Sequence, residues 1–286
     1  MPKETRVAKA STLEAADAYC RFLCRHHYEN FEVASLFVGG DLRLDLARLY
    51  AYCRTTDDLG DESADGTALA RLARWRGDVG RLFEGETPDH PVLLALGRTI
   101  RRHDMPAAPF LDLIEANVRD QHVKAYRSWD ELIGYCRLSA APVGRMVLRV
   151  FGIDDPRAGE LSDDVCIGLQ LANHAQDVSR DAAIGRRYLV ETDLDAGRTA
   201  GAVRAMVGRA RTLLASGLAL EAMVPLALRL QLAVYRQGGQ AICDAIERLG
   251  YQTEKTRPHV PLSTKLSIVV RTGVEAVTPQ KRVAAR

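Results

Sequence analysis

Two short acidic segments hold the residues of this chain that are best suited to chemistry. Residues 57–62 read Asp-Asp-Leu-Gly-Asp-Glu, and residues 173–181 read Asn-His-Ala-Gln-Asp-Val-Ser-Arg-Asp. Each segment contains two aspartates four residues apart, namely Asp57 and Asp61, and Asp177 and Asp181. If both segments are helical, residues at this spacing share one face, and four carboxylates can converge on a cavity between two helices. Such a cavity is expected to bind divalent cations.

The ligand types favour Mg²⁺ and a phosphorylated substrate. Four ionised aspartates in a low-dielectric cavity would need cations or shared protons. Their oxygens, with the amide of Asn173 one turn before Asp177, favour Mg²⁺, with Mn²⁺ as a substitute, over zinc or copper. Because Mg²⁺ completes its shell with substrate phosphates, these residues indicate a phosphorylated ligand. Arg54, one turn before Asp58, and Arg186, beyond the second segment, are expected to contact phosphate oxygens.

The elements that position these residues are predicted to be helices, because no strand-period alternation is present. The expected helices span 11–27, 41–61, 69–82, 91–102, 105–126, 131–151, 157–183, 198–222, 225–249 and 261–277. Small residues and Pro142 should kink the helix 131–151. The first acidic segment ends the helix 41–61, where the helix dipole and like-charged neighbours disfavour carboxylates, so a purely structural sequence would rarely place it there.

Length and composition predict one packed globular domain, 1–286, with flexible tails at 1–10 and 278–286. The apolar fraction is 47% and the charged fraction 27%, which excludes disordered and fibrous classes. Lys and Arg number 39 against 37 Asp and Glu, a net charge of +2, so a nucleic-acid partner is not expected. The number of copies is left open between a monomer and a homodimer.

A cytoplasmic location is expected from the cysteines and from the apolar pattern. The six cysteines lack paired zinc spacing and are best interpreted as small buried thiols in a reducing compartment. No signal peptide and no apolar run of about 18 residues occurs, so membrane contact is expected to be peripheral at most. Segment 262–277 is the candidate for such contact, although packing onto the helical bundle is favoured.

Helix faces that are aliphatic and aromatic around such a cavity suit ionisation of an allylic diphosphate, because dry walls shelter the carbocation. The chain resembles the squalene/phytoene synthase family over nearly its whole length. The resemblance is carried by 50–61, Tyr-Ala-Tyr-Cys-Arg-Thr-Thr-Asp-Asp-Leu-Gly-Asp, and by Gln170–Asn173, Asp177–Asp181 and Arg186–Leu189. Two motifs with this internal spacing and separation are improbable by chance.

The resemblance implies a fold, a ligand set and substrate contacts. The implied fold is the all-α, single-domain isoprenoid synthase bundle with a central cavity. The implied Mg²⁺ ligands are Asp57, Asp61, Asn173, Asp177 and Asp181, and the four aspartates are the implied catalytic groups. Diphosphate or prenyl contacts are expected from His27, Asn30, Tyr50, Arg54, Gln170, Arg186, Tyr188 and Tyr251.

Within the family, segments 27–31, 57–62 and 135–144 are most similar to the hydroxysqualene synthases of the bacterial hopanoid pathway. The activity this implies is conversion of presqualene diphosphate and water to hydroxysqualene and diphosphate, without NADPH. Leu138 stands where squalene and phytoene synthases usually have a tyrosine, which argues against the first condensation of two farnesyl diphosphates. Asn30 replaces a serine and Gln176 an arginine of the family pattern.

Alternatives remain open at this stage. A squalene or phytoene synthase that condenses two prenyl diphosphates is the second candidate, and a non-enzymatic assembly partner of the same fold is the third. Several residues also have plainer interpretations, which are solvation for Asp58 and Glu62, a helix end for His27, local packing for His174, a core position for Tyr188 and helix packing for Trp75 and Trp129.

Overall fold

The computed structural model describes residues 12–27, 38–61, 66–194 and 199–277. Within these ranges every regular element is a helix, and the single β-bridge joins Ala125 to Arg187. The all-α prediction is therefore confirmed. None of the described helices is both long and apolar enough to span a membrane. The predicted flexible tails lie outside the described residues.

The chain forms two compact units, and both are discontinuous in sequence. Unit 1 consists of residues 1–123 and 135–155, and unit 2 of residues 124–134 and 156–286. The backbone thus passes between the units after Val123, inside one helix after Gly134, and after Asp155. The expected single domain stays a prediction.

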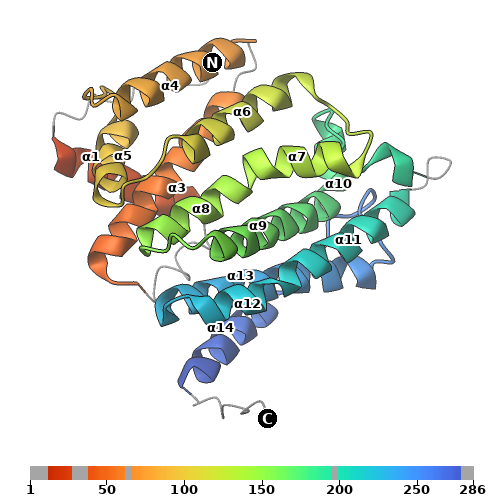
Figure 1. The fold of residues 1–286 in the computed structure, drawn as a ribbon. Coiled ribbons are helices and arrows are strands. Elements are labelled where there is room, and N and C mark those ends of the chain that lie inside the picture. The colour runs from red at the N-terminus through yellow and green to blue at the C-terminus, as the bar shows by residue number, and fades with distance from the viewer. Residues whose placement is uncertain (1–11, 28–37, 62–65, 195–198, 278–286) are drawn as a thin grey trace. The chain divides into compact units, whose positions relative to one another are not determined.

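Helix α3 is the central helix of unit 1. It contacts five other helices of that unit, α1, α4, α5, α6 and α8, as the ribbon in Figure 1 allows the reader to follow. The helices that end in unit 1 are α1 (Leu13–His27), α3 (Gly40–Asp61), α4 (Ala68–Phe83), α5 (Pro91–Arg102), α6 (Ala108–His122), α7 (Trp129–Ser139, which begins in unit 2) and α8 (Ala141–Val150). The first acidic segment therefore begins within the last two turns of the central helix of the unit.

The start of α5 follows its predicted bounds because the sequence supplies a cap. The His90 side chain accepts the Val92 backbone N–H at 3.3 Å, and Pro91 occupies the first turn, where its missing N–H costs nothing. Val92, Leu93 and Leu96 then turn inward and are completely buried. They belong to one core with the fully buried side chains Tyr52, Leu72, Phe110 and Ile114.

Helix α9 is the central helix of unit 2 and contacts α11, α12 and α13. The helices of the unit are α9 (Pro156–Gln176), α10 (Val178–Ala183), the 3₁₀ turn η1 (Glu191–Asp193), α11 (Thr199–Ala215), α12 (Gly217–Met223), α13 (Leu226–Arg248) and α14 (Leu262–Val277). A Cβ on Gly168 would lie 3.1 Å from the Ala210 carbonyl oxygen, so glycine permits the close approach of α9 and α11.

Two predicted helices are interrupted by local chemistry. The helix expected over 131–151 is two helices, α7 and α8, which meet at Ala140 where Pro142 enters the first turn of α8. The predicted kink is therefore confirmed as a break. The helix expected over 198–222 is likewise divided into α11 and α12 at Ser216. The helix expected over 105–126 is shorter, 108–122, because Pro106 and Pro109 delay its start and Val123 is extended.

Candidate active site

The first acidic cluster projects from the last two turns of α3. Asp57 and Asp61 both retain contact with solvent. Protein atoms nevertheless crowd the Asp57 carboxyl group, and this loss of hydration raises its pKa to about 6. A hydrogen bond from Asn117 lowers the pKa by a smaller amount, and the charge of Asp61 raises it. The sequence therefore placed two interacting carboxylates together here, as the four-residue spacing predicts.

Asn117 on α6 is a residue of this cluster that the sequence did not identify. Its Nδ2 donates to Asp57 Oδ1 at 3.1 Å and to the Leu113 carbonyl at 3.0 Å. Gln121, one turn later, donates to the Gly60 carbonyl at 3.2 Å. A signal existed, because Asn117 follows Leu113 at helical spacing in the buried stripe of α6, and a buried polar side chain requires a partner.

Gly60 lets α6 come close enough for that contact. A Cβ at this position would lie 2.5 Å from Asn117 Oδ1, closer than real Cβ atoms approach. Gly60 is buried even though Asp57 and Asp61 beside it are exposed. The glycine in the Asp-Leu-Gly-Asp sequence is therefore a packing requirement that aligns Asn117 with the catalytic candidate Asp57.

Arg54 lies one turn before Asp58 and forms an ion pair with it through Nη2. Asp58 is half-buried, so the interpretation of Asp58 as a merely solvated residue is wrong; the pairing with Arg54 explains its position. The Arg54 Nε atom is buried and has no hydrogen-bond partner among the described residues. A buried guanidinium N–H without an acceptor suits an anionic ligand. Tyr50, another predicted contact, is half-buried one turn earlier on α3.

The second acidic cluster lies where α9 ends, and the continuous helix predicted over 157–183 is wrong. Helix α9 ends at Gln176, Asp177 has φ −97° and ψ 15°, and α10 begins at Val178. The interruption still preserves the four-residue ladder, because the Asp177 N–H donates to the Asn173 carbonyl at 2.9 Å and the Asp181 N–H to the Asp177 carbonyl at 2.8 Å. Asn173 is exposed, while Asp177 and Asp181 are half-buried.

Asp177 has a partner that the sequence did not reveal. Arg257, in the segment between α13 and α14, donates from Nε to Asp177 Oδ1, and its Nη2 lies 3.4 Å from Oδ2. Gln176 is buried beside them and donates to the Pro258 carbonyl at 2.8 Å. The residues are about 80 positions apart in sequence, and spacing patterns do not predict contacts of this kind.

His174 is a packing residue, as one of its interpretations predicted. Its ring stacks on Tyr188 at 3.7 Å between centroids, and its Nε2 lies 3.2 Å from Gln170 Nε2. Burial, and to a smaller extent the charge of Arg186, lower the His174 pKa to about 3. The ring is therefore neutral near pH 7 and lies 4.0 Å from the Asp181 carboxylate.

Other predicted site residues are described only in part. Tyr188 is buried and stacks on Tyr126 as well as on His174, which agrees with a core position, and its substrate contact stays a prediction. Tyr251 has φ 64°, and its hydroxyl lies 3.2 Å from Glu247 Oε1. Asn30, Glu62 and the His27 side chain lie outside the described residues. The role of each as a substrate contact or solvated group stays a prediction.

The donor sets suit Mg²⁺ without forming a cage. Across the described ranges, no group of three or more His, Cys, Asp or Glu side chains is arranged to hold a metal ion. Mg²⁺ does not require one, because it is commonly held by one or two carboxylates and completes its shell with waters and substrate phosphates. Asp57 with Asp61, and Asn173 with Asp177 and Asp181, supply such oxygens. The Arg257 guanidinium at Asp177 shows that the second set attracts a cation.

The other residue types behave as the sequence predicted. All six cysteines are free thiols and are buried or half-buried. Trp75 is buried, stacks on Tyr52 and donates to Thr56 Oγ1 at 3.0 Å. Trp129 donates to Asp193 at 3.0 Å and lies under the Arg209 guanidinium. The contacts of the two tryptophans are therefore structural.

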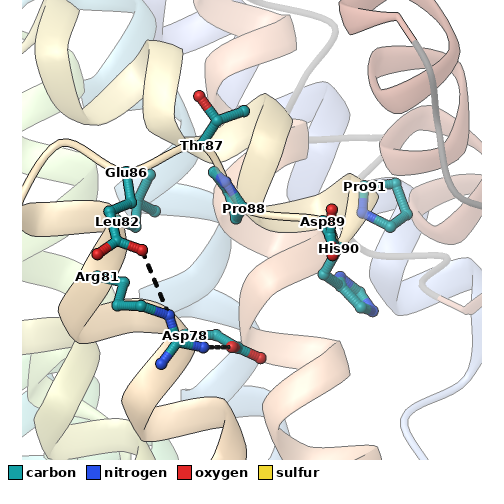
Figure 2. A pocket seen from close by; sticks show the side chains of 9 residues that line it. All are labelled: Asp78, Arg81, Leu82, Glu86, Thr87, Pro88, Asp89, His90 and Pro91. Atoms are coloured by element: carbon teal, nitrogen blue, oxygen red, sulfur yellow. Dashed lines mark hydrogen bonds and ion pairs between the residues drawn. The ribbon is translucent and has the colours of Figure 1, made fainter.

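A separate pocket of about 500 Å³ lies between α4 and α5, and none of the predicted site residues lines it. Figure 2 shows its lining, in which Arg81 is hydrogen-bonded to Asp78 and lies 3.6 Å from Glu86. The one guanidinium of this pocket is thus already neutralised by two carboxylates. Asp89 adds a third carboxylate to the lining, so acidic groups outnumber the single guanidinium among the residues that line this pocket.

Comparison with known proteins identifies the family of this chain. The model of the squalene/phytoene synthase family matches residues 24–264. A hydroxysqualene synthase of Zymomonas mobilis is 31% identical over 254 residues, covering 84% of this chain and 83% of that protein. A 15-cis-phytoene synthase of a Paracoccus species is 36% identical over 174 residues, which cover 58% of this chain and 57% of that protein.

A solved structure shows the same fold. The crystal structure of squalene synthase HpnC from Alicyclobacillus acidocaldarius superposes with a TM-score of 0.79 at 44% sequence identity, covering 84% of this chain and 95% of that one. The helical architecture of this chain is therefore shared with a squalene synthase.

Proposed function

Because the chain belongs to the squalene/phytoene synthase family and is a prenyl diphosphate synthase, we propose that it is a Mg²⁺-dependent hydroxysqualene synthase. It would convert presqualene diphosphate and water to hydroxysqualene and diphosphate in squalene and hopanoid biosynthesis. The observation that carries the proposal is the end of α3, where Arg54 Nε, which has no hydrogen-bond partner in the part of the chain that the structure describes, accompanies the interacting Asp57 and Asp61 carboxylates. These groups would supply ligands for both an anion and a cation.

One group of residues would bind the metal ion, and another would bind the phosphate groups of the substrate. Asp57 and Asp61 in unit 1, and Asn173, Asp177 and Asp181 in unit 2, would hold Mg²⁺. When bound, Mg²⁺ supplies positive charge that stabilises the departing diphosphate. Arg54 and Arg186 would donate hydrogen bonds to phosphate oxygens, since guanidinium groups match phosphate geometry.

The proposed reaction balances without a reductant. The carbon–oxygen bond of presqualene diphosphate breaks, diphosphate leaves with the electron pair, and the cyclopropylcarbinyl cation rearranges. A water molecule then forms the new carbon–oxygen bond and loses one proton. NADPH is not required because no hydride is added. Leu138, half-buried at the end of α7 where other family branches have a tyrosine, supports this branch over the condensing enzymes.

A condensing synthase is the second candidate. The similarity to the Paracoccus phytoene synthase and to the Alicyclobacillus squalene synthase favours an enzyme that joins two prenyl diphosphates. The third candidate, a non-enzymatic partner of the same fold, is disfavoured because both acidic clusters are intact.

Product analysis tests the proposal. Pure protein with presqualene diphosphate and Mg²⁺, and without NADPH, should give hydroxysqualene, and the Asp57→Asn variant is the matched inactive control. Exclusive formation of squalene, or no product at all, would contradict the proposal. Farnesyl diphosphate as the sole substrate separates the candidates, because only a condensing synthase would form a product from it.

We also propose that α14 lies on an anionic membrane surface. Its outward face carries four aliphatic side chains with exposed fractions of 58–71%, namely Leu262, Leu266, Val270 and Val274. Residues 255–286 contain seven basic residues (Lys255, Arg257, Lys265, Arg271, Lys281, Arg282 and Arg286) and one acidic residue, Glu275. An apolar stripe in a basic segment suits anionic lipid, and the lipid substrate and product would be exchanged there.

Vesicle sedimentation tests this surface. The protein should bind vesicles of phosphatidylglycerol and phosphatidylcholine, and the double variant Leu266→Asp with Val270→Asp should bind about tenfold more weakly. Leu69→Asp, at an exposed leucine of α4 in unit 1, is the matched control and should bind as the unchanged protein does. Absence of vesicle binding, with self-association that the double variant abolishes, would assign the face to a second copy of the chain.

A further inference from the structure

Arg257 is held against the second acidic cluster by more than its charge. Its guanidinium is hydrogen-bonded to Asp177, and its Nη2 also donates to Gln176 Oε1 at 3.3 Å. The Gln176 amide donates in turn to the Pro258 carbonyl at 2.8 Å. The side-chain oxygen of Gln176 thus binds Arg257 and its side-chain nitrogen binds Pro258, two consecutive residues of the segment between α13 and α14. Gln176 is a clamp that positions Arg257 on Asp177.

The contact uses the atoms that a metal would use. Arg257 Nε is bonded to one carboxylate oxygen of Asp177, and Nη2 lies 3.4 Å from the other. A divalent cation bound by Asp177 would need at least one of these oxygens, and its charge would repel the guanidinium. The two cations therefore compete for one carboxylate.

Arg257 can leave Asp177 for another anion. Its side chain is 36% exposed and that of Asp177 is 21% exposed, so the pair is reachable from solvent. Guanidinium groups bind carboxylate and phosphate oxygens with the same forked geometry, so the loss of Asp177 can be offset by diphosphate. Inorganic Mg²⁺ alone offers no such replacement, whereas Mg²⁺ together with diphosphate does.

We propose that Arg257 is a resident counter-ion of Asp177 that moves to the diphosphate when Mg²⁺ and diphosphate bind together. The proposal rests on the proposed function, because it requires a diphosphate at the second cluster. Its consequence is order in binding. Arg257 weakens the binding of the metal ion alone and strengthens the binding of the metal ion together with diphosphate. The cluster therefore binds the two as one combined ligand.

Binding measurements on unreacting ligands test the proposal. The affinity for Mn²⁺ alone, measured by electron paramagnetic resonance, should rise about three- to tenfold in Arg257→Gln, because the competing cation is removed. The affinity for inorganic diphosphate in saturating Mg²⁺, measured by calorimetry, should fall about tenfold in the same variant. Arg257→Lys should lie between, since lysine keeps the charge but loses the fork.

Two further variants control for indirect effects. Gln176→Ala removes the clamp and should change both affinities in the direction of Arg257→Gln. Arg211→Gln removes an exposed arginine of unit 2 that is bonded to Asp244 and Glu247, and it should change neither affinity. Thermal unfolding of each variant confirms that the fold is retained.

The opposite results overturn the proposal. Unchanged or weaker Mn²⁺ binding in Arg257→Gln would show that Arg257 only positions Asp177, and unchanged diphosphate affinity would show that it does not move to the ligand. If both binding shifts occur while the product assay gives no hydroxysqualene, the proposed function fails and this inference stands. If neither shift occurs while hydroxysqualene is formed, the inference fails alone.

Discussion

Helix α3 carries two sets of charged residues that behave in opposite ways. In its first half, Asp45 and Arg48 are 0% and 3% exposed and are surrounded by partners. In its last two turns, Asp57 and Asp61 reach solvent, and the pKa of Asp57 is raised to about 6. The same helix therefore holds one set of charges that the protein satisfies internally and another that it leaves in acidic excess.

The first set is satisfied by residues of three helices and by His103, which follows α5 directly. Arg48 bonds both oxygens of Asp17 on α1, at 2.7 and 2.8 Å, and one oxygen of Asp45 at 2.9 Å. Asp45 also accepts from Thr99 Oγ1 at 2.7 Å and lies 2.9 Å from His103 Nε2. Such a network joins α1, α3 and α5. A charged set with matched partners is a structural device, whereas a carboxylate excess is suited to an external cation.

The largest expected effect comes from breaking the structural set. Arg48→Met would leave Asp17 and Asp45 buried without their main cation, and should lower the free energy of unfolding by about 3–5 kcal/mol. Denaturant titration measures this loss. A decrease below about 1 kcal/mol would mean that the two sets do not differ in structural importance.

Asp57→Asn should lower the activity and leave the stability unchanged or slightly higher, the reverse of what is expected for Arg48→Met. Turnover of presqualene diphosphate should fall by about 10²–10³-fold, because a charge that stabilises the departing diphosphate through the cation is lost. The free energy of unfolding should stay equal or rise slightly, since an amide avoids the like charge of Asp61. Steady-state kinetics and denaturation of the same preparation check both halves, and a variant with half the original turnover would contradict the assignment.

A smaller effect tests how Asp57 and Asp61, the second set of charges on α3, are positioned. Gly60→Ala places a methyl group 2.5 Å from Asn117 Oδ1, so either the Asn117 side chain or α6 must shift, at a cost of about 1–3 kcal/mol. The hydrogen bond from Asn117 to Asp57 should weaken, and turnover should fall with stability. Gly80→Ala is the matched control, because the added Cβ at this α4 position meets nothing within 4 Å and should stabilise the helix by about 0.5–1 kcal/mol. Equal unfolding curves for the two variants would contradict the packing role of Gly60.

The smallest effect is a dependence on pH. The folded-state pKa of Asp57 is raised from 3.8 to about 6, so the folded protein binds this proton more tightly than the unfolded chain. The contribution of Asp57 to stability is therefore full below about pH 4 and is lost as the pH rises through about 6. Asp57→Asn should gain stability relative to the unchanged protein between pH 4 and pH 7. A difference that is constant over this range would contradict the raised pKa.

The sequence predicted the periodic features of the molecule and missed those that depend on contacts between distant residues. The bounds of α5, 91–102, were predicted without error because a cap and a proline mark its start and the apolar spacing marks its face. The break of the second motif helix at Asp177 was missed, since no glycine or proline marks it. Residue spacing within a helix does not predict a contact with a partner 80 residues away, such as that of Asp177 with Arg257.

The site shows the same division. Asp57, Asp61 and Arg54 could be identified because their chemistry and spacing are local to one helix. The sequence marks Asn117 as a buried polar residue, but the contacts of Asn117 and Gln121 with this cluster arise only where α6 packs on α3 beside Gly60. The meeting of the two acidic clusters on one substrate stays a prediction.

The discontinuity of the two units has a consequence for biosynthesis. The core of unit 1 includes Met146 and Val150 of α8, yet residues 124–134, which belong to unit 2, are translated before them. An emerging chain therefore cannot finish unit 1 before it has begun unit 2. A gene divided between codons 123 and 124 would encode one fragment that contains all of unit 2 and another that lacks residues 135–155 of unit 1. Complementation by such halves should therefore require their association before unit 1 acquires a complete core.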